Sequence, residues 1–255
     1  MSDYDRYANT RYGAGLARSG VAVDQGLRAY MIGVYNYMTI GLGVTGLVAY
    51  AAFTLGTVDV GNGRLALTDF GHAIYASPLR WLIVLSPLAL VFWLSARINS
   101  MSVSTARNAF IAFAALIGLS MSALLVVYTG ASIGRAFFAA AAAFASLSLY
   151  GYTTQRSLSA MGSFMMMGVI GLIVAGLINM FLHSTGLQFG ISLLAVVIFA
   201  GLTAWDTQAI KQMYFSGDSY EMVHKKSIHG ALRLYLDFIN MFQAILMLTG
   251  SQRNS

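Results

Sequence analysis

Seven long apolar stretches constrain this chain more than any other feature. An α-helix needs about 20 mostly apolar residues to cross a hydrocarbon core about 30 Å thick. The predicted spans cover residues 30–53, 79–96, 108–128, 135–149, 162–182, 190–208 and 230–249, of which the fourth is the shortest. Only 9% of the residues are charged, whereas soluble domains carry roughly 25%. The sequence therefore predicts an all-α integral membrane protein with seven transmembrane helices.

The predicted organisation is a single membrane domain between two tails. Residues 1–29 form the N-terminal tail, residues 30–250 the seven-helix domain and residues 251–255 the C-terminal tail. The first 29 residues lack an apolar core, so we expect no cleavable signal peptide, and the first span would serve as the insertion signal. The sequence contains no cysteine, which excludes disulfides and thiolate metal sites.

Lysine and arginine are divided unequally between the two sides of the membrane. Eleven lie on the side of the N-terminus and of the connection between spans six and seven, and four lie on the other side. Cytoplasmic flanks accumulate basic residues, so we expect a cytoplasmic N-terminus and a C-terminus outside. The formal net charge of +6 then reflects topology, and we expect no nucleic-acid partner.

Two aspartates, Asp206 and Asp237, fall inside the sixth and seventh spans, while the other seven acids lie in predicted water-facing segments. An Asp at the centre of a membrane helix costs roughly 2.5 to 3.5 kcal/mol to insert, and acids retained there are functional candidates. Consecutive spans run antiparallel, so both aspartates should lie at similar depth near the cytoplasmic end. Polar neighbours share their helix stripes: Thr203 and Thr207 with Asp206, and Arg233, Asn240 and Gln243 with Asp237.

Two facing carboxylates have a direct electrostatic consequence. At about 4 Å and an effective dielectric constant of about 20, they repel by roughly 4 kcal/mol when both are ionised. We therefore expect Asp206 and Asp237 to share one proton near neutral pH and to act as a pH sensor. Once deprotonated, the pair would offer hard oxygen ligands to a cation such as Ca²⁺. A structural alternative is that the two aspartates are hydrogen-bonded to Arg233 or to Thr or Tyr neighbours and hold the bundle together. Arg97 or Arg233 could also neutralise one of them, which would fix it as charged and abolish the shared proton.

At these same residues the sequence resembles a known family. AWDTQAIKQM around Asp206 and LYLDFINMF around Asp237 closely resemble the paired signatures of the Bax inhibitor-1/YccA-like family, and SLYGYTTQRSLSAMGSF between spans four and five fits it too. The resemblance covers residues 33–250. It implies a seven-helix fold whose last helix is wrapped by the other six, and a proton-sharing pair at Asp206 and Asp237 that controls a pH-sensitive calcium leak.

The same resemblance carries expectations about location and partners. Bacterial members are associated with modulation of a membrane-bound AAA protease, and eukaryotic members with suppression of cell death. A bacterial inner-membrane location follows, with the lipid bilayer, Ca²⁺ and H⁺ as partners. One feature departs from the family. In relatives an arginine latch follows the Phe-Trp pair of the second span by two positions, but here Ser95 follows Phe92 and Trp93, and the nearest arginine is Arg97.

Three functions remain open at this point. A cation leak needs a polar route beyond the aspartates, for which the candidates are Asn179, Asn240, Gln243, Ser120 and Ser122. A non-conducting regulator would instead bind other membrane proteins. An intramembrane aspartyl protease also needs two aspartates on adjacent spans, but such proteases carry Gly-x-Gly-Asp, and neither aspartate follows that pattern here. We therefore expect no enzyme and no cofactor, with Ca²⁺ as a bound or permeant ion.

Overall fold

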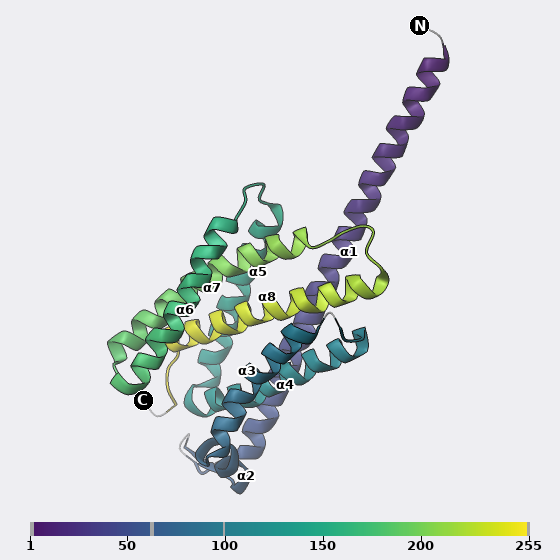
Figure 1. Cartoon of the computed structure of the whole chain (residues 1–255). Helices are drawn as coiled ribbons and strands as arrows, with labels where there is room; N and C mark the ends of the chain where they lie inside the picture. The colour runs from purple at the N-terminus through teal and green to yellow at the C-terminus, as the bar shows by residue number, and fades with distance from the viewer. Residues whose placement is uncertain (1–2, 62–63, 99, 254–255) are drawn as a thin grey trace.

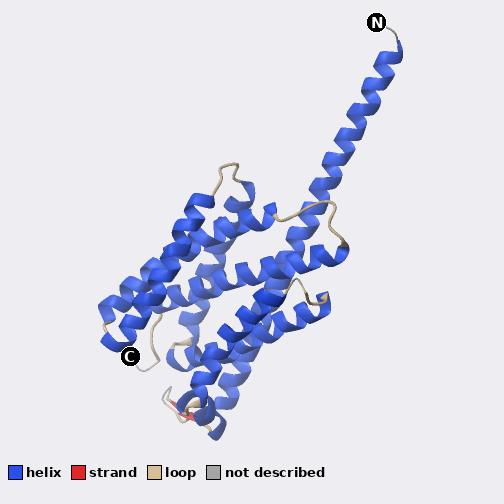
Figure 2. Cartoon of the chain, viewed as in Figure 1, coloured by secondary structure: helices blue, strands red, loops and turns tan. Residues whose placement is uncertain are grey.

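The computed structural model describes residues 3–61, 64–98 and 100–253, with side chains from Gln25 onward. Nearly all of the described chain is helical (Figure 2). Seven of its helices are long and apolar enough to cross a membrane. The predicted all-α membrane fold with seven spans is therefore confirmed.

The spans are joined by short connections, except between the first two. The elements are α1 (Asp3–Gly56), β1 (Thr57–Asp59), β2 (Leu65–Leu67), α2 (Asp69–Gly71), a π-helical turn η1 (His72–Ala76), α3 (Leu79–Arg97), α4 (Val103–Val127), α5 (Gly130–Thr153), α6 (Ser159–Leu182), α7 (Thr185–Gln212) and α8 (Tyr220–Thr249). Strands β1 and β2 pair antiparallel, with Thr57 opposite Leu67. The inner face is the end of the bundle that holds the α7–α8 connection, which the charge bias assigns to the cytoplasm. The outer face is the opposite end.

The predicted fourth span, residues 135–149, is too short. Helix α5 begins five residues earlier and ends four residues later. Thr129 starts it, because its side-chain oxygen accepts a hydrogen bond from the backbone N–H of Ser132. Small residues and tyrosines lower the hydropathy of both ends, but they remain helical where they pack against neighbouring helices.

The two ends of the chain extend the predicted membrane domain. Helix α1 begins at Asp3, and Figure 1 shows its N-terminal end extending beyond the other helices. The side chains of residues 1–24, among them Arg6, Arg11 and Arg18 of the charge bias, lie outside the described set. At the C-terminus, the backbone N–H of Arg253 donates to the carbonyl of Val127 at 2.9 Å. Residues 254–255 lie outside the described residues.

Helix α8 is the most buried of the seven spans. In an 18-residue apolar stretch of α8, 61% of the residues are buried, compared with 6% to 33% in the corresponding stretches of the other six spans. It packs mainly against α1, α4, α5 and α7, whereas α3 packs chiefly on α4, and α6 on α7. Figure 1 shows α8 running through the bundle among these helices. For α3 and α6, the implied wrapping of the last helix stays a prediction.

A buried tyrosine fixes α8 against two neighbours. The ring of Tyr235 makes edge contacts with Phe110 and Phe113 of α4, at centroid distances of 5.9 and 5.8 Å. Its hydroxyl forms a 2.6 Å hydrogen bond with the hydroxyl of Thr45 on α1. A buried hydroxyl without a partner would cost about 1 to 3 kcal/mol, so this bond sets the rotation of α8 against α1.

Close approach of α5 to α7 depends on Gly151, and this gives the first prediction. A Cβ at Gly151 would lie 2.1 Å from the backbone carbonyl oxygen of Ala204, two residues before Asp206. Gly151→Ala should force the helices apart and destabilise the fold by about 1 to 3 kcal/mol. Thermal unfolding in detergent measures this as a lower Tm.

Gly134 is the matched control on the same helix, because a Cβ there meets nothing within 4 Å. Gly134→Ala should leave Tm unchanged or raise it, since alanine favours a helix over glycine by about 1 kcal/mol. Equal Tm values for the two variants would contradict the packing assigned to Gly151.

Candidate functional site

The structure brings the two aspartates of α7 and α8 together near the inner face. Asp206 is 6% exposed and Asp237 is 4% exposed. The two carboxyl groups lie within electrostatic reach of each other and line the same cavity. One oxygen of Asp237, Oδ2, has no N–H or O–H donor among the described residues.

Arg233 provides the positive charge beside this pair. Its Nε donates to Oδ2 of Asp206 at 3.2 Å, and its Nη2 donates to Oδ1 of the same carboxylate. This bidentate geometry is the strongest arrangement between an arginine and a carboxylate. The guanidinium also lies over the ring of Trp205, 5.2 Å from its centroid. Arg233 precedes Asp237 by four residues on α8, so both lie on the same face of that helix.

Two further groups lie within electrostatic reach of Arg233. They are His229, one turn earlier on α8, and Tyr30 of α1. Tyr30 is buried and His229 is half-buried, and neither the Nδ1 atom of His229 nor the hydroxyl of Tyr30 has a hydrogen-bond partner among the described residues. The cluster therefore contains hydrogen-bonding atoms that no described side chain satisfies.

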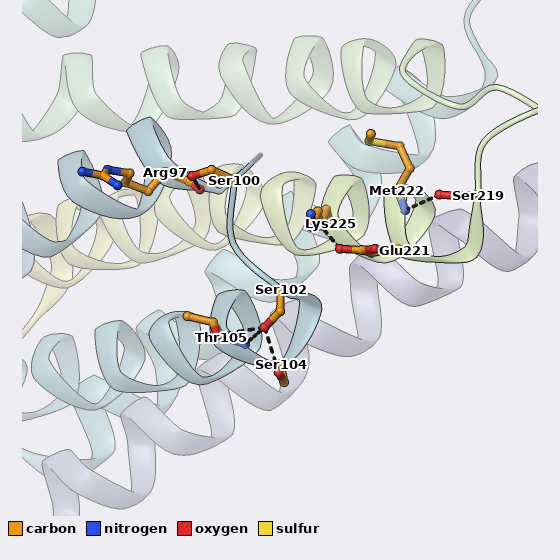
Figure 3. A network of polar contacts seen from close by, with 9 residues as sticks. All are labelled: Arg97, Ser100, Ser102, Ser104, Thr105, Ser219, Glu221, Met222 and Lys225. Carbon is orange, nitrogen blue, oxygen red and sulfur yellow. Dashed lines mark hydrogen bonds and ion pairs between the residues drawn. The ribbon is translucent and has the colours of Figure 1, made fainter.

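Of the two arginines expected as charge partners, only Arg233 contacts an aspartate. Arg97 ends α3, and no ion pair joins it to an acid within the described part of the chain. Figure 3 shows it beside the α3–α4 connection, where its carbonyl accepts a hydrogen bond from Ser100. The nearby pair of Lys225 and Glu221 at the start of α8 is a separate contact (Figure 3). The charge partner of the aspartates is therefore Arg233, on the same helix as Asp237, and not Arg97 of α3.

The residues that follow Asp206 fix the end of α7 in position. The side-chain amide of Gln208 accepts from the backbone N–H of Leu158 at 2.8 Å and donates to the carbonyl of Arg156 at 2.9 Å. Lys211 donates to the carbonyl of Tyr152 at 2.8 Å. These bonds tie the α5–α6 connection to α7. They explain why the segment SLYGYTTQRSLSAMGSF and the segment around Asp206 form one structural unit.

Trp205 is held by a glycine of α6. A Cβ at Gly162 would lie 2.1 Å from the indole ring, so this position has no room for a side chain. The ring in turn lies beneath Arg233. Close packing of α6 on α7 therefore determines where the guanidinium sits.

A cavity of about 610 Å³ opens beside the aspartates, with walls from α3, α6, α7 and α8. Asp206, Asp237 and Arg233 line it near the inner face. Towards the outer face its polar lining is Asn240, Gln243, Gln188 and Ser192. Asp206 and Gln188 are 18 residues apart, or about 27 Å along a helix. The cavity therefore follows nearly the whole of a hydrocarbon core about 30 Å thick.

Several predicted neighbours occupy other places. Thr207 points to α5, where its hydroxyl lies 3.0 Å from that of Ser148. Thr203 donates to the carbonyl of Phe199, and neither threonine lines the cavity. Ser122 bonds to Tyr75 at 2.9 Å, away from α7 and α8, and Ser120 lies near that contact. Asn179 does not line the cavity, but its side-chain amide donates a hydrogen bond to Gln188, which does, at 3.1 Å.

Sequence reasoning missed Gln188 and Ser192 on the cavity wall. A periodic signal was present, because residues 188, 192, 195, 199, 202 and 206 recur every three or four positions along α7. All six line the cavity. Tracing the stripe back from Asp206 would have identified both residues.

The donor set at the aspartates suits a transient cation better than a resident one. No group of three or more His, Cys, Asp or Glu side chains comes together in the described portion of the protein. Asp206, Asp237 and the nearby amide of Asn240 offer hard oxygens, but Ca²⁺ takes six to eight oxygen ligands. Water would have to supply the remainder, and Arg233 competes for Asp206.

The ion pair gives a pH prediction for stability. Arg233→Gln leaves two buried acids without a counter-charge, so the folded variant must hold an extra proton. Its free energy of unfolding relative to wild type should fall as the pH rises from about 6 to about 8, by up to about 1.4 kcal/mol per pH unit. Thermal unfolding in detergent at both pH values measures the difference.

The double variant Arg233→Gln/Asp237→Asn is the control, because one of the two acids is removed with the arginine. It should lose most of the extra pH dependence. Parallel pH profiles for wild type and Arg233→Gln would show that Arg233 does not balance the charge of the pair.

Comparison with known proteins gives close relatives over almost the full length. Residues 27–254 match the family described as inhibitor of apoptosis-promoting Bax1. The chain is 44% identical over 231 residues to the uncharacterized protein RP147 of Rickettsia prowazekii, covering 91% of this chain and 93% of that protein. A Caulobacter vibrioides protein is 40% identical over 256 residues, covering 99% and 100%. The inner membrane protein YbhL of Escherichia coli K12 is 39% identical over 231 residues, covering 89% and 94%.

Proposed function

This chain belongs to the Bax inhibitor family, and from that premise we propose that it is a pH-sensitive cation leak of the bacterial inner membrane, with Ca²⁺ as the ion carried. The observation that carries the proposal is the burial of Asp206 and Asp237 near each other at the inner end of one cavity. A membrane relative, YbhL, supports the inner-membrane location. The basic residues at the inner face support a cytoplasmic N-terminus and a C-terminus outside.

The polar lining of the cavity supports its use as an ion route. Asn240 and Gln243 from α8 and Gln188 and Ser192 from α7 offer oxygens at successive depths. A cation that has lost part of its water shell needs such oxygens in its place. The apolar remainder of the walls makes the route costly to hydrate, so the expected behaviour is a slow leak.

Protonation of the aspartate pair controls this route in the proposal. With one shared proton, the remaining negative charge is balanced by Arg233, and the site attracts no cation. Loss of that proton leaves two carboxylates and one guanidinium, a net charge of −1. The extra carboxylate draws a cation and competes with Asp206 for Arg233. Cation flux should therefore rise as the pH at the inner face rises.

A flux assay in proteoliposomes tests the proposal. Wild-type Ca²⁺ flux should be higher at about pH 8 than at about pH 6, because the shared proton is lost as the pH rises. Asp237→Asn, which resembles the protonated state permanently, should show low flux without pH dependence. Asp206→Asn should also lose the pH dependence, because no second acid remains to share a proton.

Two controls separate the aspartate pair from other titrating groups. Asp69→Asn changes an exposed acid of the outer connection and should behave as wild type. His229→Asn removes the histidine near Arg233 and should keep the pH profile. A pH profile that persists in both Asp206→Asn and Asp237→Asn would contradict the proposal, and so would a profile that disappears in His229→Asn.

Two other functions give different outcomes in the same preparation. Flux no higher than in empty liposomes would favour a non-conducting regulator of other membrane proteins, such as a membrane-bound AAA protease. Cleavage of a labelled membrane-spanning peptide that depends on Asp206 and Asp237 would favour an aspartyl protease. The second outcome is disfavoured by geometry, because Arg233 engages both oxygens of Asp206 and leaves that carboxylate poorly placed to activate water.

A further inference from the structure

A second cavity lies between α1 and α5. It has a volume of about 470 Å³ and is lined from α1 by residues that include Arg28 and Tyr35, and from α5 by residues that include Ala145, Ser148 and Tyr152. Helices α1 and α5 both pack along α8, but few of their described residues approach each other. The α1–α5 crevice is therefore a gap between two spans, separate from the cavity beside the aspartates.

The walls of the α1–α5 crevice suit hydrocarbon. Met31, Ile32, Phe144 and Leu149 line it with apolar side chains. Two of its three hydroxyls bond to each other, because that of Tyr35 lies 2.6 Å from that of Ser148. A polar ligand would find few free partners inside. Its volume of about 470 Å³ is on the order of that of one acyl chain.

The rim at the inner face is basic. Arg28 lines the crevice, is exposed, and forms no ion pair with the described side chains. Lys211 lies at the other edge, where it donates to the carbonyl of Tyr152 and sits over its ring, 4.9 Å from the centroid. No acid lines the crevice. A phosphate at this rim would meet positive charge, and arginine binds phosphate through its planar fork of N–H groups.

These observations select a lipid over a protein helix as the occupant. The rim offers positive charge to a phosphate, and the walls below it are mainly apolar for about 10 Å along α1, from Arg28 to Tyr35. We propose that the α1–α5 crevice binds an anionic phospholipid of the inner leaflet, with its phosphate at Arg28 and one acyl chain between α1 and α5. Basic pockets between spans are the usual sites for such headgroups.

Native mass spectrometry of the full chain in mild detergent tests this site. Protein is incubated with phosphatidylglycerol or with phosphatidylcholine of the same chain length, and the retained lipid is counted. Wild type should retain phosphatidylglycerol in preference. Arg28→Gln should lower that retention about tenfold, towards the level of phosphatidylcholine, because it removes a charge-assisted contact. Glycerol 3-phosphate, which has the charge but no chains, should not displace the lipid.

A second variant tests the binding site of the acyl chain. Ala145 is exposed on α5, so Ala145→Trp fills the crevice without entering the core, and it should reduce retention of both lipids. Arg107→Gln and Ala142→Trp are the matched controls, since both residues are exposed and lie outside the crevice. Both should behave as wild type. Equal retention of the two lipids by wild type, or retention by Arg28→Gln equal to that of Arg107→Gln, would overturn the proposal.

Discussion

The contact among Asp206, Asp237 and Arg233 places three ionisable groups inside an apolar bundle. Burying a charge in such surroundings costs several kcal/mol unless another charge balances it. Two acids and one guanidinium balance only if one acid keeps its proton. The rest of the site follows from this condition. It links the protonation of one carboxyl to the net charge at the end of the cavity, and so to whether a cation is attracted there.

The packing of α7 and α8 makes this contact possible. Helix α8 carries a polar face that lipid would not tolerate, and its position inside the bundle removes that face from lipid. Gly151 and Gly162 let α5 and α6 approach α7 at the level of Asp206. Gln208 then ties the α5–α6 connection to the same helix. The charged cluster therefore depends on backbone contacts at positions that carry no charge.

Hydropathy was sufficient to predict the seven spans, because the length of an apolar helix is a property of local sequence. It failed at the ends of α5, where Gly130 and Thr153 remain helical through capping and packing that hydropathy does not measure. Antiparallel neighbours at equal depth also suggested that Asp206 and Asp237 could face each other. The choice between Arg97 and Arg233 depended on how α3 and α8 are rotated in the bundle, which single-helix patterns do not determine.

The polar residues proposed for the ion route show the same limit of single-helix patterns. Ser122 was a reasonable candidate by composition, yet it bonds to Tyr75 because the outer connection folds back onto α4. Gln188 was missed because it lies five helical turns from Asp206, although both residues belong to the same stripe of α7. The lipid crevice depends on a gap between α1 and α5, two helices far apart in sequence, and no stripe on either helix predicts it.

Infrared difference spectroscopy of the carboxyl C=O stretch tests the central claim most directly, because only a protonated carboxyl gives that band. The spectrum of the wild-type protein in lipid near neutral pH should contain one buried protonated carboxyl. That band should disappear or shift in both Asp206→Asn and Asp237→Asn, since each removes one member of a pair that shares the proton. Absence of a protonated carboxyl in the wild type at neutral pH, or a band unchanged in both variants, would contradict the account.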